Sequence, residues 1–251
     1  PFVLDTDADA TTRQYGVYAM DTFRATETIA ATVSMRYNYA SIAISDRTGQ
    51  TPALNGTNTY RRLNPAVGAT WNVADQSTLY ASWSQGMRVP TPMELTCADP
   101  NAPCTLPNIF VADPPLLPVI GTTVELGARG LWTPQRDARI GWSVAAFRTD
   151  LRDDIQFIAS GAGAANSGYF QNVGRTRREG FELGLNGSTG SLTLAVAYSY
   201  TSATFQTAFV ENSPNNSTSG ADGTITVNPG DRIPGIPTQV LKLRATWSPV
   251  P

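Results

Sequence analysis

The chain contains no histidine and only two cysteines among its 251 residues, which limits the chemistry it can perform. Ser-His-Asp and Cys-His catalysis both require histidine, and so do most zinc ligand sets. Glu179 and Glu182 remain as candidates for acid–base catalysis, but nothing around them in the sequence organises a partner. We therefore predict that the protein is not an enzyme and carries no resident cofactor.

The two cysteines lie close together in a proline-rich stretch. Cys97 and Cys104 enclose six residues in the sequence CADPNAPC. We predict a disulfide that staples this loop, which would place it in an oxidising compartment. Two free thiols or a metal-binding pair are the alternatives. Neither histidine nor a further cysteine is present to complete such a metal site.

Several aspartates raise the possibility of a calcium site, since calcium prefers carboxylate oxygens. Their spacing matches no twelve-residue calcium loop, so we expect solvated charges in loops and at strand ends, and no metal site. They are Asp99, Asp113, Asp150, Asp153 and Asp154.

The elements that position these residues are predicted to be long β-strands. Apolar and small polar residues alternate with a period of two, which a strand satisfies and a helix does not. The clearest case is a long hairpin over residues 167–206, with a glycine-containing turn at 186–190. Pro65 is expected to interrupt the ladder of its own strand. The predicted strands are 13–24, 29–45, 60–73, 77–86, 122–132, 139–158, the two arms of the hairpin, and 238–247.

The alternation and the connections together favour a membrane barrel over a soluble sandwich. Charged residues are only 15% of the chain, well below the quarter typical of soluble domains. Short and long connections alternate, as periplasmic turns and extracellular loops do in outer-membrane barrels. Aromatic residues lie near the strand ends, as girdles would: Tyr37, Tyr39, Trp71, Trp83, Trp132, Trp142, Tyr198, Tyr200 and Trp247.

Other classes are disfavoured by composition. No run of about 18 apolar residues is present, so no transmembrane helix is predicted. The net charge is −2 and no basic cluster occurs, which argues against a nucleic-acid partner. The chain starts without a methionine and ends directly after a predicted strand, so we expect it to be a piece of a longer protein.

Five stretches resemble the barrel part of TonB-dependent outer-membrane receptors, in that family's order. The resemblance covers residues 60–247, and the part before Tyr60 agrees more loosely. The stretches are LYASWSQGMRVPTPMEL (79–95), TTVELGARG (122–130), FRTDLRDDIQFI (147–158), YFQNVGRTRREGFELGLNG (169–187) and DRIPGIPTQVLKL (231–243).

This resemblance implies an all-β, up-and-down transmembrane barrel of about 22 strands with a plugged interior. Residues 1–251 would form part of that barrel domain, with the plug domain and the C-terminal strands lying outside the chain. It further implies a Gram-negative outer membrane, surrounding lipid, a plug partner, and TonB engaged through an N-terminal region that is not in this chain. The transported ligand would be scarce and bulky, most often an Fe(III)–siderophore complex.

Candidate ligand-binding residues follow from the resemblance and the strand pattern. Arg88, Glu125, Arg129 and Glu182 are expected on the interior faces of strands, with Arg36, Lys242 and Arg244 as further interior cations. Salt bridges to the plug or within the interior are the favoured role for these charges, and direct ligand contact is the alternative. In the long loops, the apolar candidates for ligand contact are Phe110, Leu116 and Leu117; packing within the loop explains them equally well.

Two other classes stay open from the sequence: a passive porin or autotransporter-type barrel, and a soluble β-sandwich adhesin. The ligand stays open too, among siderophore, cobalamin, haem, another metal chelate or a small cofactor. Haem is disfavoured because these residues offer no axial histidine. Nine strands cannot close a barrel of the expected width, so we also expect the first and last strands to expose edges.

Overall fold

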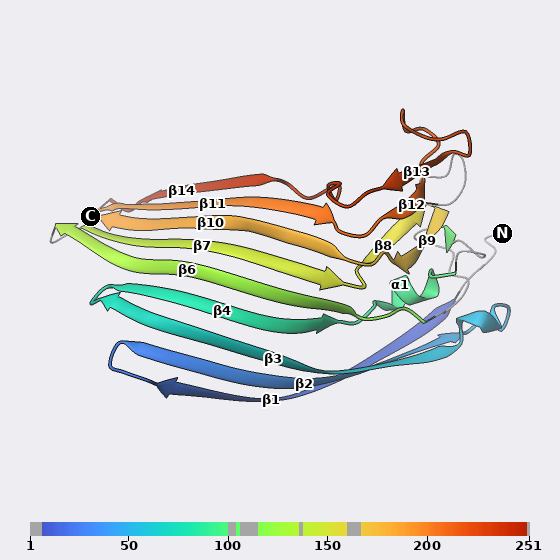
Figure 1. The fold of residues 1–251 in the computed structure, drawn as a ribbon, viewed down its shortest axis with the longest axis horizontal. Helices are drawn as coiled ribbons and strands as arrows, with labels where there is room; N and C mark the ends of the chain where they lie inside the picture. Colours follow the sequence, from blue (N-terminus) through green and yellow to red (C-terminus); the bar gives the residue numbers. More distant parts are fainter. Residues whose placement is uncertain (1–6, 100–103, 106–114, 136–137, 160–166, 250–251) are drawn as a thin grey trace.

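The computed structural model describes residues 7–99, 104–105, 115–135, 138–159 and 167–249. Its main feature is one antiparallel sheet of nine strands, each hydrogen-bonded to the next along the chain (Figure 1). This up-and-down order confirms the predicted partial barrel wall. Its strands are β1 (Ala8–Arg24), β2 (Ile29–Asp46), β3 (Gly56–Ala74), β4 (Ser77–Arg88), β6 (Val119–Gln135), β7 (Ala138–Arg152), β10 (Thr176–Thr189), β11 (Leu192–Phe205) and β14 (Gln239–Trp247).

The connections separate by length between the two ends of the sheet. Short turns at 25–28, 75–76 and 190–191 lie at one end, and the long connections lie at the other (Figure 1). None of the helices among the described residues is long and apolar enough to cross a membrane. The long-connection end holds η1 (Pro52–Leu54), α1 (Pro92–Thr96), the small sheet β5–β9–β8 (Cys104–Thr105, Ser167–Asn172, Ile155–Ala159) and the hairpin β12–β13 (Phe209–Asn212, Thr224–Val227).

One face of the nine-stranded sheet is apolar and exposed. Residues paired across antiparallel strands share a face, and one such row joins Val33, Val67, Trp83 and Val124 from β2 to β6. Leu126 on this face is 63% exposed. Among the described residues no second sheet covers it, although a β-sandwich requires one. An apolar face of this extent is suited to lipid.

The buried side chains gather at the long-connection end, beyond the apolar wall. One cluster packs Ile42 of β2 and Leu95 of α1, both fully buried, against Leu116 and Val119. A second cluster joins Phe205 to residues of β13 and the connection that follows it. The long connections therefore form a packed cap on the strand ends, held by its own hydrophobic cores.

The prediction of a continuous strand over 139–158 is wrong. β7 ends at Arg152, Asp153 adopts a left-handed conformation with φ of 57°, and β8 joins the small sheet. The first arm of the predicted hairpin breaks at the same level, where Gly174 has φ of 88°. Asp154 donates its amide to the Gly174 carbonyl at 2.9 Å. The hydrogen bond thus joins the two breaks, and the chain leaves the nine-stranded sheet at both of them.

Two smaller predictions also need correction. The hairpin turn is at Gly190 and Ser191, because residues 186–189 continue the ladders of β10 on both sides. Gly190 takes φ of 52°, which glycine adopts without steric cost. Pro65 pairs with Met35 without interrupting the β2–β3 ladder, whereas pairing between β3 and β4 begins only after it, at Ala66.

Candidate ligand-binding site

The polar face of the sheet carries the charged residues that the strand pattern predicted for a barrel interior. Arg129 of β6 lies over the ring of Tyr80 on the neighbouring strand, with its guanidinium carbon 6.0 Å from the ring centre. This packing requires glycine at position 127, since a Cβ there would lie 2.4 Å from the Tyr80 ring. The small residues of this face therefore leave room for the large side chains of the neighbouring strands.

Glu125 and Glu182 lie on the same polar face but are not brought together. Glu125 of β6 pairs with Phe147 of β7, and Glu182 of β10 pairs with Ala145, so β7 separates the two carboxylates. Glu182 instead borders a hollow of about 430 Å³ together with Lys242 of β14. The two glutamates thus belong to different parts of the interior wall.

A larger hollow of about 710 Å³ lies on the polar face near the short-turn end. Arg129, Lys242 and Arg244 line it together with Asn186. Within the described ranges none of these three cations forms an ion pair with a carboxylate. This part of the wall is therefore positively charged and offers donors to whatever fills the inside of the barrel.

A third hollow, of about 660 Å³, lies at the long-connection end between β1, β2 and the segment that leads into α1. Arg36, Asn38, Arg88 and Gln14 contribute polar atoms to it. Arg36 donates from Nε to the Asn38 side chain at 2.6 Å, which fixes the guanidinium. A Cβ at Gly16 would clash with this guanidinium. We call this hollow, defined by these residues, the mouth pocket.

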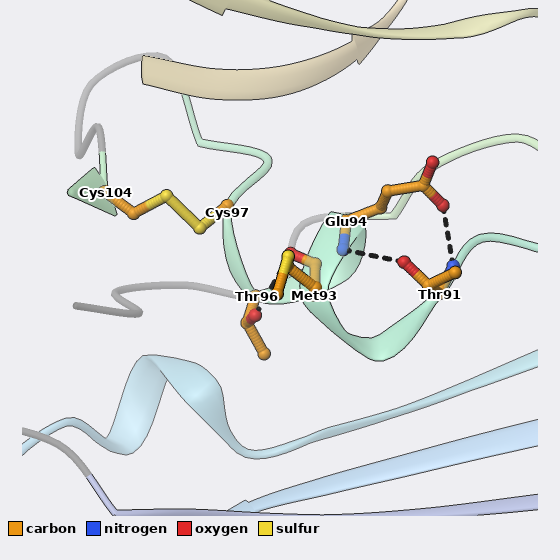
Figure 2. Close-up of a disulfide and its surroundings, with 6 residues drawn as sticks. All are labelled: Thr91, Met93, Glu94, Thr96, Cys97 and Cys104. Atoms are coloured by element: carbon orange, nitrogen blue, oxygen red, sulfur yellow. Dashed lines mark hydrogen bonds between the residues drawn. A yellow bond between two sulfur atoms is a disulfide. The ribbon is translucent and has the colours of Figure 1, made fainter. Parts of the chain in front are cut away.

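Arg88 has a structural tie in addition to its place in the mouth pocket. Its guanidinium donates to both carboxylate oxygens of Glu94, at 2.9 and 3.1 Å. Glu94 completes a capping box at the start of α1, accepting from the Thr91 amide at 2.7 Å while the Thr91 hydroxyl accepts from the Glu94 amide (Figure 2). Arg88 is still 46% exposed, so part of the guanidinium is open to a ligand.

The cysteines of the proline-rich loop are joined by a disulfide just beyond α1 (Figure 2). Their Cα atoms are 5.5 Å apart, and both residues are buried. The Cys97 carbonyl accepts from the Phe170 amide, and Cys104 pairs with Gly168. The bridge therefore connects the end of α1 to the small sheet β5–β9–β8 and makes these parts of the mouth one unit.

The apolar loop candidates are placed differently from one another. Leu116 is 7% exposed and packs in the hydrophobic cluster, whereas Leu117 is 57% exposed. Asn172, which the sequence did not single out, holds this segment by accepting from the Leu117 amide at 2.9 Å and donating to the Leu117 carbonyl at 3.0 Å. Phe110 lies outside the described residues. Only Leu117 of the described pair is offered to a ligand.

The hairpin β12–β13 and β8 enclose a further hollow of about 390 Å³. Phe157, Phe205 and Phe209 line it, together with the partly buried Glu211. Burial raises the pKa of the Glu211 carboxyl above its ordinary value. The sequence does not single out this hollow, because β8 in one connection and the hairpin β12–β13 in another create it together.

Of the aspartates considered for calcium, Asp113 lies outside the described residues, and two of the others are already engaged by neighbouring side chains. Asp150 accepts from Arg148 and Arg177, while Asp154 is buried and accepts from the Thr176 hydroxyl. No group of three histidine, cysteine, aspartate or glutamate residues suited to a metal ion occurs in the part of the chain that the structure describes. The carboxylates of the strand ends thus serve the packing of the wall.

The family model described as "TonB dependent receptor-like, beta-barrel" matches residues 1–251, the whole chain. The chain belongs to the TonB-dependent receptor family. This membership confirms the predicted resemblance and separates the chain from porins, autotransporter-type barrels and β-sandwich adhesins.

Solved structures of TonB-dependent receptors have the same fold. The ferric-catecholate import receptor Fiu of E. coli matches with a TM-score of 0.62 at 18% identity, over 96% of this chain and 33% of its own. The pyoverdine receptor FpvA of Pseudomonas aeruginosa, solved with pyoverdine bound, gives 0.62 at 17%, over 96% and 29%. The copper transporter OprC gives 0.60 at 23%, over 78% and 29%.

The chain spans about a third of the length of these TonB-dependent receptors. In this family frame, the apolar face of the nine strands faces lipid and the polar face lines the barrel interior. The mouth pocket and the disulfide unit lie at the end with long loops. The cationic hollow lies at the end with short turns.

Proposed function

We propose that this TonB-dependent receptor segment forms part of an outer-membrane transporter for an anionic iron chelate of the siderophore class. The mouth pocket carries the proposal. It has about 660 Å³, within the range of roughly 300–1,000 Å³ typical of small-molecule sites, and it contains two guanidinium groups. It lies at the long-connection end, where a ligand from outside the cell would arrive first.

The charge of the mouth pocket supports a chelate over a bare metal ion. Catecholate and carboxylate chelators give iron complexes with net negative charge and outward-facing oxygens. Arginine presents several N–H donors in a planar fork that suits such oxygens. Arg36 and Arg88 would repel a free metal cation at this entrance. A siderophore-like ligand is therefore favoured over uncomplexed iron or copper.

The remaining parts of the transporter follow from the same proposal. Residues 1–251 supply a section of the barrel wall, and a plug domain elsewhere in the full-length protein fills the interior. The cations Arg129, Lys242 and Arg244, which form no ion pair within the described ranges, would face that plug. TonB would engage the plug side from the periplasm of a Gram-negative cell and drive release of the ligand inward.

A binding titration of the full-length receptor tests the ligand class. We expect Arg36→Gln to weaken binding of an anionic ferric chelate by about tenfold or more, because a hydrogen bond to a charged group contributes roughly 1.5–3 kcal/mol. Arg24→Gln, which removes the same charge from the short-turn end of β1, is the matched control. If Arg36→Gln bound every anionic chelate as tightly as the wild type, the mouth pocket would not be the site.

A further inference from the structure

The lipid-facing wall carries arginines at one defined level, just beyond an aromatic patch. Phe181 of β10 packs against Tyr198 and Tyr200 of β11, with ring centres 5.8 and 5.6 Å apart. Phe181 pairs with Ala146 of β7 on the apolar face. Aromatic residues in such positions mark the interface between hydrocarbon and headgroups. This patch therefore fixes the depth of the wall in the membrane on the long-loop side.

Charged residues replace apolar ones immediately beyond the aromatic patch. Going from Phe181 toward the long loops, the next outward pairs are Glu179 with Arg148 and Arg177 with Asp150. Two residues along a strand advance it by about 7 Å. The two arginines therefore lie one and two steps beyond the aromatic rings, at the depth of the lipid headgroups.

Arg148 and Arg177 are bonded to Asp150 only through Nε, so their terminal amino groups can still bind a ligand. Arg148 and Arg177 each donate from Nε to a different oxygen of Asp150, at 3.0 and 2.7 Å. Asp150 thereby holds the two side chains next to each other. Their terminal amino groups have no protein partner in the part of the chain that the structure describes. Glu179 is paired in register with Arg148, yet the described residues show no ion pair between them.

A second place on the wall repeats the arrangement. Tyr15 of β1 and Tyr39 of β2 pack with ring centres 6.2 Å apart, and Tyr39 pairs in register with Arg61 of β3. Arg61 is exposed, and its register places it on the lipid-facing side with Leu63 and Val67. Aromatic rings with adjoining arginines thus occur twice on the lipid-facing side, once on β7, β10 and β11 and once on β1 to β3.

We propose that Arg148 and Arg177, oriented by Asp150, bind the phosphate groups of outer-leaflet lipid headgroups, with Arg61 making a second contact. This inference rests on the outer-membrane location in the proposed function. Arginine binds phosphate through two parallel N–H···O bonds, and the paired forks face the headgroup layer. The apolar wall beneath them would hold the acyl chains of the same lipid.

Native mass spectrometry of the detergent-purified full-length receptor tests this site with diphosphorylated lipid A as the probe. We expect Arg148→Gln with Arg177→Gln to weaken lipid binding by about tenfold or more. The control is Arg47→Gln with Arg232→Gln, which removes the same charge from the long connections. Undiminished binding in the first variant, or an equal loss in the control, would overturn the proposal.

Two further measurements keep the outcome decisive. If the first variant does not fold, wild-type receptor is compared with lipid A from which both phosphates have been removed, and equal binding of the two lipids would also overturn the proposal. Titration of the ferric chelate on the same variant separates this inference from the transport proposal. We expect its affinity for the chelate to be unchanged, because the two arginines face away from the mouth pocket.

Discussion

The Thr176 hydroxyl donates a hydrogen bond of 2.7 Å to Asp154 Oδ2, and both residues are buried where the strands leave the barrel wall. Asp154 also accepts from the Ile155 amide at 3.1 Å. Its backbone bonds to Val173 and Gly174 close the break from the opposite strand. This pair therefore holds together the junction between the membrane wall and the small sheet β5–β9–β8.

Replacing the donor at this junction should loosen the mouth. Thr176→Val keeps the shape of the side chain but removes the shortest donor to Asp154 Oδ2, leaving only Gln156 Nε2 at 3.5 Å and the Arg178 guanidinium at 3.7 Å. We expect this to cost about 1–3 kcal/mol. We expect faster hydrogen exchange in β8 and β9, measured on the full-length receptor in detergent. Thr57→Val, at an exposed position of β3, is the control and should change nothing. Equal exchange in both variants would contradict this role.

The packing of Tyr80 over Gly127 gives a steric prediction for the interior wall. Gly127→Ala places a Cβ 2.4 Å from the Tyr80 ring, so the ring must move at a cost of about 1–3 kcal/mol. Thermal unfolding of the receptor in detergent should show the loss. Gly86→Ala, where a Cβ meets nothing within 4 Å, should be neutral. Adding Tyr80→Ala to Gly127→Ala removes the ring, so Gly127→Ala should then cause no further loss of thermal stability beyond that of Tyr80→Ala alone. A full additional loss would refute the steric explanation.

The disulfide should order the mouth without stabilising the barrel. Replacing Cys97 and Cys104 by serine removes a short-loop constraint of roughly 2 kcal/mol. The Phe170 amide, which donates to the Cys97 carbonyl, should then exchange faster, while unfolding of the barrel strands stays unchanged. Wild-type receptor treated with reductant should behave like the serine variant. A protected Phe170 amide in both samples would show that the bridge does not hold the small sheet.

The hairpin β12–β13 should respond to pH through Glu211. Burial raises the pKa of Glu211 in the folded state, so ionisation opposes the fold. The destabilisation is absent below the unfolded pKa, grows as pH rises toward the folded pKa, and is complete above it. Glu211→Gln should therefore slow hydrogen exchange of the hairpin at neutral pH and have little effect in acid. A pH-independent difference between the two proteins would exclude this cause.

The sequence predicts the wall of this protein much better than its mouth. The strands of the wall pair with neighbours in chain order, so alternation alone predicts most of these strands and their up-and-down order. The break at Asp153 was missed because Leu151, Ile155 and Phe157 share one parity on both sides of it, although three charged residues interrupt the alternation at 152–154. Its cause is tertiary, since the break depends on bonds to Gly174 and Thr176, on another strand.

Part of the candidate site could likewise be predicted from the sequence, and part could not. The interior face of Arg129 and Glu182 followed from strand parity, which needs only a period of two. The mouth pocket did not, because it forms where the β4–α1 connection approaches β1 and β2. The Asn186-Gly187 pair also misled the turn assignment, since such pairs favour two-residue turns, yet both residues are paired with β7 here.

The proposed TonB-driven transport of an anionic iron chelate can be measured as uptake of radioactive iron. Cells expressing the full-length receptor would be given the chelate, with and without a functional TonB. We predict uptake that requires both the receptor and TonB and that Arg36→Gln reduces. Uptake that continues unchanged without TonB, or an absence of receptor-dependent uptake for any anionic iron chelate, would contradict the account.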